Sequence, residues 1–312
     1  IEWVCWGGCL ASGLLILNIL PRISLLLLYC LYLSLIYAGQ AFMTFQWDLF
    51  LLETGVLAFF LVRPSLLGIW LMRWLIFRFM LGGGLVKILS GDPAWPEFTA
   101  LSYYFETEPL PTPLAWYAHH LPQGLLSFAT ASSLILELVI PFLFFFPRRI
   151  RFIAAVGTIF LETIILLTGN YNFFNLLTIL LCLPLFDDAA IAWLIPKPLR
   201  NFLNQRTKPN IAPTNRFVAS FAWTFALITV TVSIIQFPIR FGVSTPAAFV
   251  WLNDMIAPLR LVSGYGPFAV ITKKRMEIII EGSADGQHWK EYSFNYKPGD
   301  IFRRPPWNFP HQ

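Results

Sequence analysis

Apolar runs long enough to cross a lipid bilayer recur along this chain and constrain its fold more than any other feature. They cover, approximately, residues 3–20, 23–44, 45–62, 66–89, 123–146, 150–168, 172–195 and 217–237. A helix needs roughly 20 apolar residues to cross a hydrocarbon core about 30 Å thick. The pattern therefore predicts an α-helical polytopic membrane protein with about seven or eight apolar segments. The runs 23–44 and 45–62 adjoin without a loop, so we expect one of them to be re-entrant or half-buried.

The low charge content supports the same class. Charged residues make up only 12% of the chain, whereas a soluble domain carries about 25%. The stretch Lys273–Arg275 is too short to indicate nucleic-acid binding. The lipid bilayer is therefore the first partner that the composition predicts, and nucleic acid is not expected.

The distribution of charge between the loops predicts an orientation. Basic residues gather in the turns near 22, 63 and 148–151 and in the longer loop between the apolar runs 172–195 and 217–237. They are Arg22, Arg63, Arg148, Arg149, Arg151, Lys197, Arg200, Arg206, Lys208 and Arg216. Residues 90–122 hold four carboxylates and no Lys or Arg. Because basic loops stay in the cytoplasm, we expect loop 90–122, the turn at 169–172 and everything after 238 to be extracytoplasmic.

The C-terminal part changes character and predicts a second domain. The stretch "MEIIIEGSADGQHWKEYSFNY" alternates apolar and polar residues around Ala284-Asp285-Gly286, which is typical of a β-hairpin. One hairpin alone is marginally stable. We therefore expect a transmembrane helical domain at 1–237, and an extracytoplasmic β-sandwich-like domain at 238–312 that is truncated at Gln312.

Ionisable residues inside the apolar runs need a partner or a function, because each costs roughly 2.5–3.5 kcal/mol on insertion scales. The runs 45–62 and 66–89 are joined by a short turn and should form an antiparallel pair. Glu53 lies 11 residues before Pro64 and Arg73 nine after it, while Asp48 and Arg78 lie 16 before and 14 after. This spacing predicts two ion pairs, Glu53 with Arg73 and Asp48 with Arg78.

Two interpretations of these buried charges remain open. They are structural clamps that hold the helices together, or they line a polar cavity for a ligand or for chemistry. In the second case the candidate acids and bases are Asp48, Glu53 and Glu162. The glycines Gly82-Gly83-Gly84 indicate a kink or a close helix contact.

The polar turn "TGNYNFFN" after residue 167 also has two interpretations. Asn172 and Asn175 are expected to cap helix ends, because amide oxygens accept hydrogen bonds from free backbone N–H groups. The alternative is a ligand site lined by Asn170, Tyr171 and Asn172.

No cofactor or metal site is expected from the sequence. His119 and His120 are adjacent, so on a helix their side chains would point about 100° apart. The four cysteines all fall in apolar runs, which is typical of small buried side chains. No phosphate-binding glycine loop, dinucleotide motif or nucleophile elbow is present.

Five stretches in the same order resemble the lipase maturation factor family. They are "FQWDLFLLETGVLAFF", "SGDPAWPEFTALSYYFETEPLPTPLAWYAHHLP", "ELVIPFLFFFPRR", "LTGNYNFFNLLTI" and "EIIIEGSADGQHWKEYSFNYKPGD" with the following "RRPPWNFPHQ". The family pattern matches this chain at Gln46, Trp47, Asp48, Glu53, Gly91, Asp92, Trp95, Glu106, Thr107, Pro109, Pro111, Gly169, Asn170, Asn172, Phe173, Phe174 and Asn175. The resemblance implies that a first transmembrane segment precedes Ile1 and that the chain continues past Gln312.

The resemblance implies a membrane-bound maturation factor rather than a hydrolase. It would assist the folding of secreted, lipase-like client proteins on the extracytoplasmic side, in the endoplasmic reticulum membrane of a eukaryote or the inner membrane of a bacterium. The family is more distantly similar to carboxylase-like membrane proteins. A membrane-embedded enzyme acting on a lipid or polypeptide, and a structural subunit of a membrane complex, are therefore the alternatives.

Overall fold

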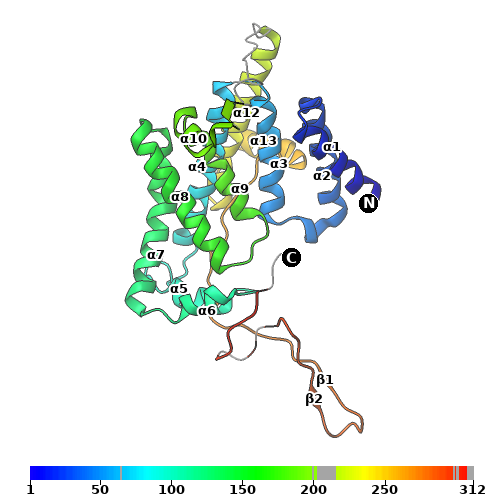
Figure 1. Cartoon of the computed structure of the whole chain (residues 1–312), viewed down its shortest axis with the longest axis vertical. Helices are drawn as coiled ribbons and strands as arrows, with labels where there is room; N and C mark the ends of the chain where they lie inside the picture. Colours follow the sequence, from blue (N-terminus) through cyan, green and yellow to red (C-terminus); the bar gives the residue numbers. More distant parts are fainter. Residues whose placement is uncertain (64, 199, 202–215, 298, 300–301, 308–312) are drawn as a thin grey trace.

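The computed structural model describes residues 1–63, 65–198, 200–201, 216–297, 299 and 302–307 (Figure 1). The predicted basic residues Arg206 and Lys208 lie outside the described residues. The helices are α1 (Glu2–Ile16), α2 (Pro21–Gly39), α3 (Gln46–Ala58), α4 (Leu66–Leu89), α5 (Ala100–Thr107), α6 (Pro113–His119), α7 (Gln123–Leu138), α8 (Arg148–Thr168), α9 (Phe174–Leu181), α10 (Asp188–Leu194), α12 (Arg216–Arg240) and α13 (Ala247–Ile256). Short 3-10 turns are η1 (Gln40–Met43), η2 (Phe59–Leu61), η3 (Ile140–Phe145), η4 (Leu183–Leu185) and η5 (Ala257–Leu259). The strands are β1 (Glu281–Gly282) and β2 (Lys290–Glu291).

Within the described residues, five helical stretches are long and apolar enough to cross a membrane. They are Pro21–Met43, Leu66–Leu89, Gln123–Phe145, Arg148–Thr168 and Arg216–Arg240. The predicted runs 3–20, 45–62 and 172–195 form shorter helices. The last of these is divided into α9, η4 and α10, because Pro184 lies in the turn between them and cannot continue a helix.

Helix α4 is the centre of the bundle, since two-thirds of the residues in its apolar stretch are buried. Its first turn is fixed by the Ser65 side chain, which accepts a hydrogen bond from the Gly68 backbone N–H, as N-cap residues do. Phe79 of α4 stacks on Phe50 of α3 with ring centroids 4.6 Å apart and meets Phe174 of α9 edge-on at 5.2 Å. Aromatic packing therefore holds the short helices α3 and α9 against the central span.

The acidic loop 90–122 and the basic turns lie at opposite ends of the bundle, as the sequence predicts. Figure 1 shows α5, α6 and the β1–β2 hairpin together at one end. The turn after α8 lies at the same end, because Tyr171 bonds to Tyr104 of α5. Since α4 and α8 each run toward this end, the basic residues before α4 and at the start of α8 lie at the opposite end.

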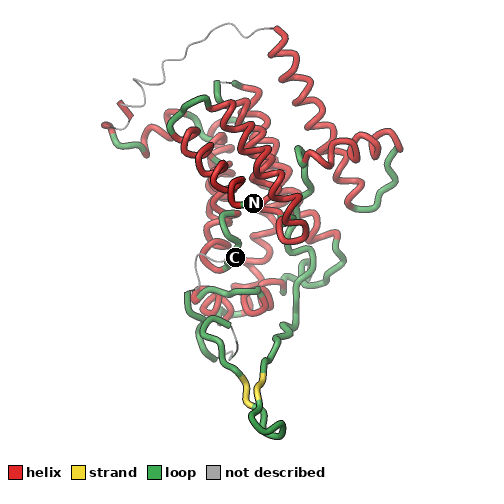
Figure 2. Tube along the Cα trace, turned by 90° about the vertical axis from the view of Figure 1, so that its right-hand side faces the viewer, coloured by secondary structure: helices red, strands yellow, loops and turns green. Residues whose placement is uncertain are grey.

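Residues 262–271, called the junction segment here, connect α13 to the hairpin without forming a helix or strand. Val262 packs with α12 and α13 in a small apolar cluster. Tyr265 belongs to the main core, and Ile271 packs with α5. The junction segment therefore runs through the protein toward the α5–α6 end before the chain reaches the hairpin (Figure 2). This part of the predicted C-terminal unit is packed as part of the bundle.

The hairpin forms as predicted. β1 pairs antiparallel with β2, with Glu281 opposite Glu291, and its loop is held by Asp285, which accepts bonds from the backbone N–H groups of Gln287 and His288. Among the described residues the two strands form one two-stranded sheet, so the β-sandwich-like domain remains a prediction.

The glycine triplet in α4 makes close contacts, one of the two predicted roles. A Cβ atom at Gly82 would lie 2.8 Å from the carbonyl oxygen of Tyr265, and one at Gly84 would lie 2.7 Å from the Leu138 side chain. A Cβ atom at Gly83 would lie 3.7 Å from the Glu137 carboxyl group, an ordinary contact. Only a glycine at 82 therefore lets the junction segment approach α4 this closely.

We expect Gly82→Ala to lower the free energy of unfolding by about 1–3 kcal/mol, because the added methyl group overpacks a contact with backbone. Gly83→Ala is the matched control, and we expect it to be neutral or stabilising by about 0.5–1 kcal/mol, since alanine favours a helix interior. Unfolding curves of the purified variants measure both values. Equal effects of the two substitutions would contradict the close approach at Gly82.

Candidate functional site

Glu53 binds the junction segment in the middle of the bundle. This fully buried carboxylate forms an ion pair with Arg78 of α4. Its second oxygen accepts hydrogen bonds from the Ser263 backbone N–H at 3.2 Å and from the Tyr265 hydroxyl at 2.7 Å. Arg78 in turn donates to the Ser263 carbonyl oxygen at 2.9 Å. Both helices thus hold the same residue of the junction segment.

Two more side chains bind the next peptide groups. Gln46, at the start of α3, accepts a hydrogen bond from the Gly266 N–H at 3.0 Å. Arg240, at the end of α12, donates to the carbonyl oxygens of Tyr265 at 2.7 Å and Gly266 at 3.3 Å. Irregular backbone at membrane depth is tolerated only where protein groups satisfy its N–H and C=O groups. These side chains supply the required partners.

In loop 90–122, Asp92 and Trp95 bind the far end of the junction segment. The Asp92 carboxylate accepts bonds from the backbone N–H groups of Ile271 at 2.7 Å and of Ala94 at 3.0 Å. Burial alone would raise the pKa of Asp92, but these N–H groups favour the charged form and hold the pKa below its ordinary value. The Trp95 indole N–H donates to the carbonyl oxygens of Phe268 at 3.2 Å and Ala269 at 3.3 Å.

Four residues of the family pattern, Gln46, Glu53, Asp92 and Trp95, therefore bind one segment that lies about 170 to 220 positions further along the chain. Sequence reasoning missed the junction segment, because its own residues have ordinary composition. The available signal was the polar residue Ser263 among apolar ones, followed by glycines at 264 and 266.

The two ion pairs predicted from helix spacing are wrong. Arg78 pairs with Glu53. Arg73 instead donates to the Pro184 carbonyl oxygen at 2.9 Å, and Asp48 accepts a hydrogen bond from the Tyr32 hydroxyl of α2 at 2.5 Å. The prediction assumed two straight helices that meet at residue 64. In fact α3 ends at Ala58 and a 3-10 turn follows it, so counting from the turn does not give relative depth.

A second buried ion pair lies nearer the α5–α6 end. The Lys87 ammonium group of α4 lies 2.6 and 2.5 Å from the two carboxyl oxygens of Glu137 on α7. It also lies 4.8 Å from the centre of the Trp95 ring. Lys87 therefore connects α4, α7 and loop 90–122.

Glu162 of α8 is buried and accepts a hydrogen bond from the Asn175 amide at 2.7 Å. The predicted capping role of Asn175 is therefore wrong, and the residue before α9, Phe173, makes no side-chain cap. Asn172 does not cap α9 either. It has a φ angle of +55°, a conformation that asparagine tolerates better than most residues.

The remaining family-pattern residues shape the surroundings. Trp47 stacks on Phe45 with ring centroids 4.6 Å apart, and Gly91, two residues after the end of α4, has a φ angle of +77°. A Cβ atom at Gly169 would lie 2.2 Å from the Tyr171 ring, so glycine permits this turn. Asn170 lies in the same turn.

Glu108 forms a buried network with two tyrosines at this end. The Tyr171 hydroxyl lies 3.0 Å from one Glu108 oxygen and 2.7 Å from the Tyr104 hydroxyl. Burial raises the pKa of Glu108 to about 9, although Tyr171 and Arg275 act in the opposite direction. The folded protein therefore keeps Glu108 protonated at neutral pH.

Because the pKa of Glu108 is higher in the folded than in the unfolded state, stability should fall as pH rises from about 4.5 to about 9. We expect Glu108→Gln to remove this dependence and to raise the free energy of unfolding at pH 7, by on the order of 3 kcal/mol. Unfolding curves measured across this pH range test it. Glu97→Gln, an exposed change in the same loop, is the control, and an unchanged pH slope in Glu108→Gln would contradict the buried acid.

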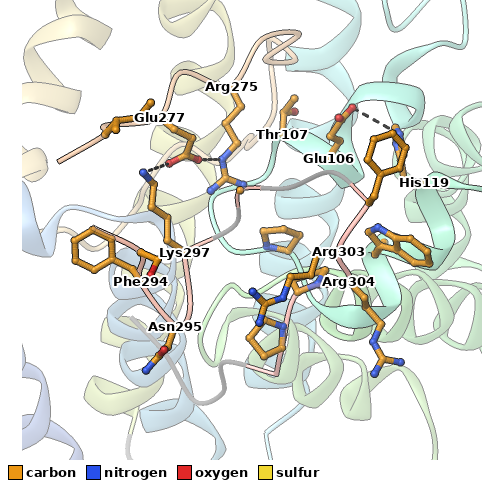
Figure 3. A pocket seen from close by; sticks show the side chains of 18 of the residues that line it. Glu106, Thr107, His119, Arg275, Glu277, Phe294, Asn295, Lys297, Arg303 and Arg304 are labelled. Carbon is orange, nitrogen blue, oxygen red and sulfur yellow. Dashed lines mark hydrogen bonds and ion pairs between the residues drawn. The ribbon is translucent and has the colours of Figure 1, made fainter. Parts of the chain in front are cut away.

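A cleft of about 660 Å³ opens beside this network (Figure 3). One wall comes from α5 and α6, and the other from residues 273–279 before the hairpin, from β2 and from the residues after it. The lining includes Glu106, Thr107, Trp116, His119, His120, Lys273, Arg275, Glu277, Tyr292, Phe294, Asn295, Lys297, Phe302, Arg303, Arg304, Pro305 and Pro306. Arg275 ties the walls together, since it pairs with Glu277 and donates to the carbonyl oxygens of Glu108 at 2.6 Å and Pro109 at 2.8 Å.

The described residues contain no group of three or more His, Cys, Asp or Glu side chains arranged to hold a metal ion. His119 lies 3.6 Å from Glu106, and His120 bonds to the Trp116 carbonyl oxygen at 2.7 Å. The side chains that line the cleft offer charges, hydrogen-bonding groups and aromatic rings for recognition.

The fold and these contacts define an integral membrane protein. Its helical bundle binds the junction segment through buried side chains, and a cleft lies at one end of the bundle. Residues 1–193 match the family described as lipase maturation factor transmembrane domain, and residues 261–312 match the lipase maturation factor C-terminal domain. The chain belongs to the lipase maturation factor family.

Curated relatives agree with this assignment. The chain is 34% identical to lipase maturation factor 1 of Mus musculus, over 96% of this chain and 56% of the relative. It is 34% identical to lipase maturation factor 2 of Rattus norvegicus and 33% identical to that of Homo sapiens, in both cases over 98% of this chain and 59% of the relative. The chain thus spans less than three-fifths of the length of these relatives. No solved structure matches it.

Proposed function

We propose that this chain acts in a membrane-bound maturation factor for secreted, lipase-like client proteins. The observation that carries the proposal is that both family domains match in order, one on the helical bundle and one on the segment that leaves it. The relatives are named lipase maturation factors. The cleft beside α5 and α6 supports a role in contacting another protein.

We also propose a location and an orientation. The relatives come from animals, which supports the endoplasmic reticulum membrane rather than a bacterial inner membrane. The basic residues at the end opposite the cleft support a cytoplasmic position for that end. The cleft would then face the lumen, where secreted clients fold.

For the buried carboxylates we propose structural roles. Both oxygens of Glu53 are engaged, by Arg78 on one side and by Ser263 and Tyr265 on the other. Asp48 and Glu162 each accept a hydrogen bond from a neighbouring helix or turn. These contacts support clamps rather than acid–base catalysts.

We further propose that α1, α3 and α9 lie within the bilayer beside the five long spans, and that the hairpin is part of a β-rich unit. The apolar character of α1 and α9 and the packing of α3 against the long span α4 support the first statement. The marginal stability of an isolated hairpin supports the second.

The function is tested by complementation. Cells that lack their own lipase maturation factors would express this chain together with a secreted lipase, and the activity of the lipase in the medium would be measured. We expect activity to be restored while secretion of an unrelated protein stays unchanged. If the chain reaches the membrane intact and the lipase stays inactive, the proposal fails.

The orientation is tested separately with glycosylation acceptors. An acceptor placed in loop 90–122 should be modified in microsomes, and one placed beside Arg149 should not. The reverse pattern would place the cleft in the cytoplasm and would refute a lumenal client.

A further inference from the structure

The cleft carries an excess of positive charge. Its lining contains five Lys or Arg residues and three Glu residues, namely Lys273, Arg275, Lys297, Arg303 and Arg304 against Glu106, Glu277 and Glu291. Glu277 is already paired with Arg275 and lies 4.0 Å from Lys297. Glu106 faces His119. The carboxylates are thus largely occupied by groups on their own wall.

Arg303 and Arg304 have no carboxylate partner among the described residues, and Figure 3 shows them apart from the Arg275, Glu277 and Lys297 group. Arg304 donates to the Tyr117 hydroxyl at 3.1 Å and lies 5.9 Å from the centre of that ring. This contact orients one guanidinium group without neutralising it. Guanidinium groups bind carboxylates with two parallel hydrogen bonds, so the pair is suited to acidic side chains.

Flat and apolar side chains line the cleft together with the charged groups. The rings of Trp116 and His120 pack together with centroids 4.2 Å apart. Phe294, which lines the cleft, is half exposed, and Pro305 and Pro306 follow the two arginines directly. A ligand that fits this lining carries carboxylates with apolar groups between them.

We propose that the cleft binds an extended acidic segment of the client protein, in which Glu or Asp residues alternate with apolar ones. This inference rests on the proposed function, which supplies a protein as the ligand. The volume of about 660 Å³ falls within the ~300–1,000 Å³ of typical ligand sites, which suits a few extended residues. Two chain segments wall the cleft, which favours a single strand over a flat membrane surface.

Direct binding tests the inference. The whole chain, held in nanodiscs of phosphatidylcholine, is titrated into a fluorescein-labelled peptide of alternating Glu and Val, and into a Lys and Val peptide of the same length. We expect anisotropy to rise for the acidic peptide, and binding to weaken as salt concentration increases. Equal binding of the two peptides, or of neither, would overturn the inference.

The variant that removes the two guanidinium charges is Arg303→Gln with Arg304→Gln. We expect its affinity for the acidic peptide to fall roughly tenfold or more. The matched control is Arg148→Gln with Arg149→Gln, two adjacent arginines at the opposite end of the bundle, which should leave affinity unchanged. Unfolding curves confirm that both variants fold. An unchanged affinity in the first variant would overturn the inference.

Three further outcomes separate this inference from its alternatives. If phosphatidylserine vesicles bind through Arg303 and Arg304 and the acidic peptide does not, the ligand is a membrane surface and the inference is wrong. If the peptide binds as expected but secreted lipase activity is not restored, the proposed function fails while the cleft specificity stands. If activity is restored equally by the parent and by the Arg303/Arg304 variant, only the cleft inference fails.

Discussion

Glu53→Gln is expected to lower the free energy of unfolding by roughly 3–5 kcal/mol, the typical effect of breaking a buried ion pair on one side. The substitution leaves the Arg78 charge without a counter-ion in the protein interior. It also weakens two hydrogen bonds to the junction segment. Unfolding of the purified protein in detergent, together with the yield of monodisperse material, measures the loss.

Two control variants separate this pair from the one that helix spacing predicts. Glu53→Gln with Arg78→Met should recover part of the lost stability, because no unpaired charge remains buried. Arg73→Met should have a smaller effect, since the Arg73 side chain bonds to a carbonyl oxygen and not to Glu53. If Arg73→Met rather than Arg78→Met compensates for Glu53→Gln, the observed pairing is wrong.

Lys87→Met is the second substitution with a large expected effect, again roughly 3–5 kcal/mol. It removes the partner of the buried Glu137 carboxylate and the cation above the Trp95 ring. Because Trp95 holds the junction segment, we also expect the loop around it to become more accessible to protease. Limited proteolysis and unfolding curves measure the two effects.

The control for Lys87→Met is a substitution in an exposed ion pair of the same chain. Arg148 pairs with Asp187 at the opposite end of the bundle, and its side chain is 58% exposed. Arg148→Met should cause no measurable loss, because solvent-exposed ion pairs contribute little. Comparable losses in the two variants would show that burial does not set the strength of these contacts.

The placement of the acidic loop 90–122 and the basic turns at opposite ends of the bundle could be predicted, because it follows from the charges of each loop alone. The turn at Tyr171 does lie beside loop 90–122. The cleft escaped prediction, because its walls come from α6 and from residues near 300 that no local pattern relates to each other.

The chain's apolar runs by themselves determined that it is a helical membrane protein, because the bilayer admits few other solutions for such segments. The sequence also identified Glu53 and Arg78 as charges that need partners. Only the tertiary structure decided that they pair with each other and with the backbone of residues 263–265. Depth and rotation along two helices depend on where each helix ends, and α3 ends earlier than its apolar run. The junction segment carries no periodic signal, and its place is set by polar groups that lie far away in the sequence and bind its peptide bonds.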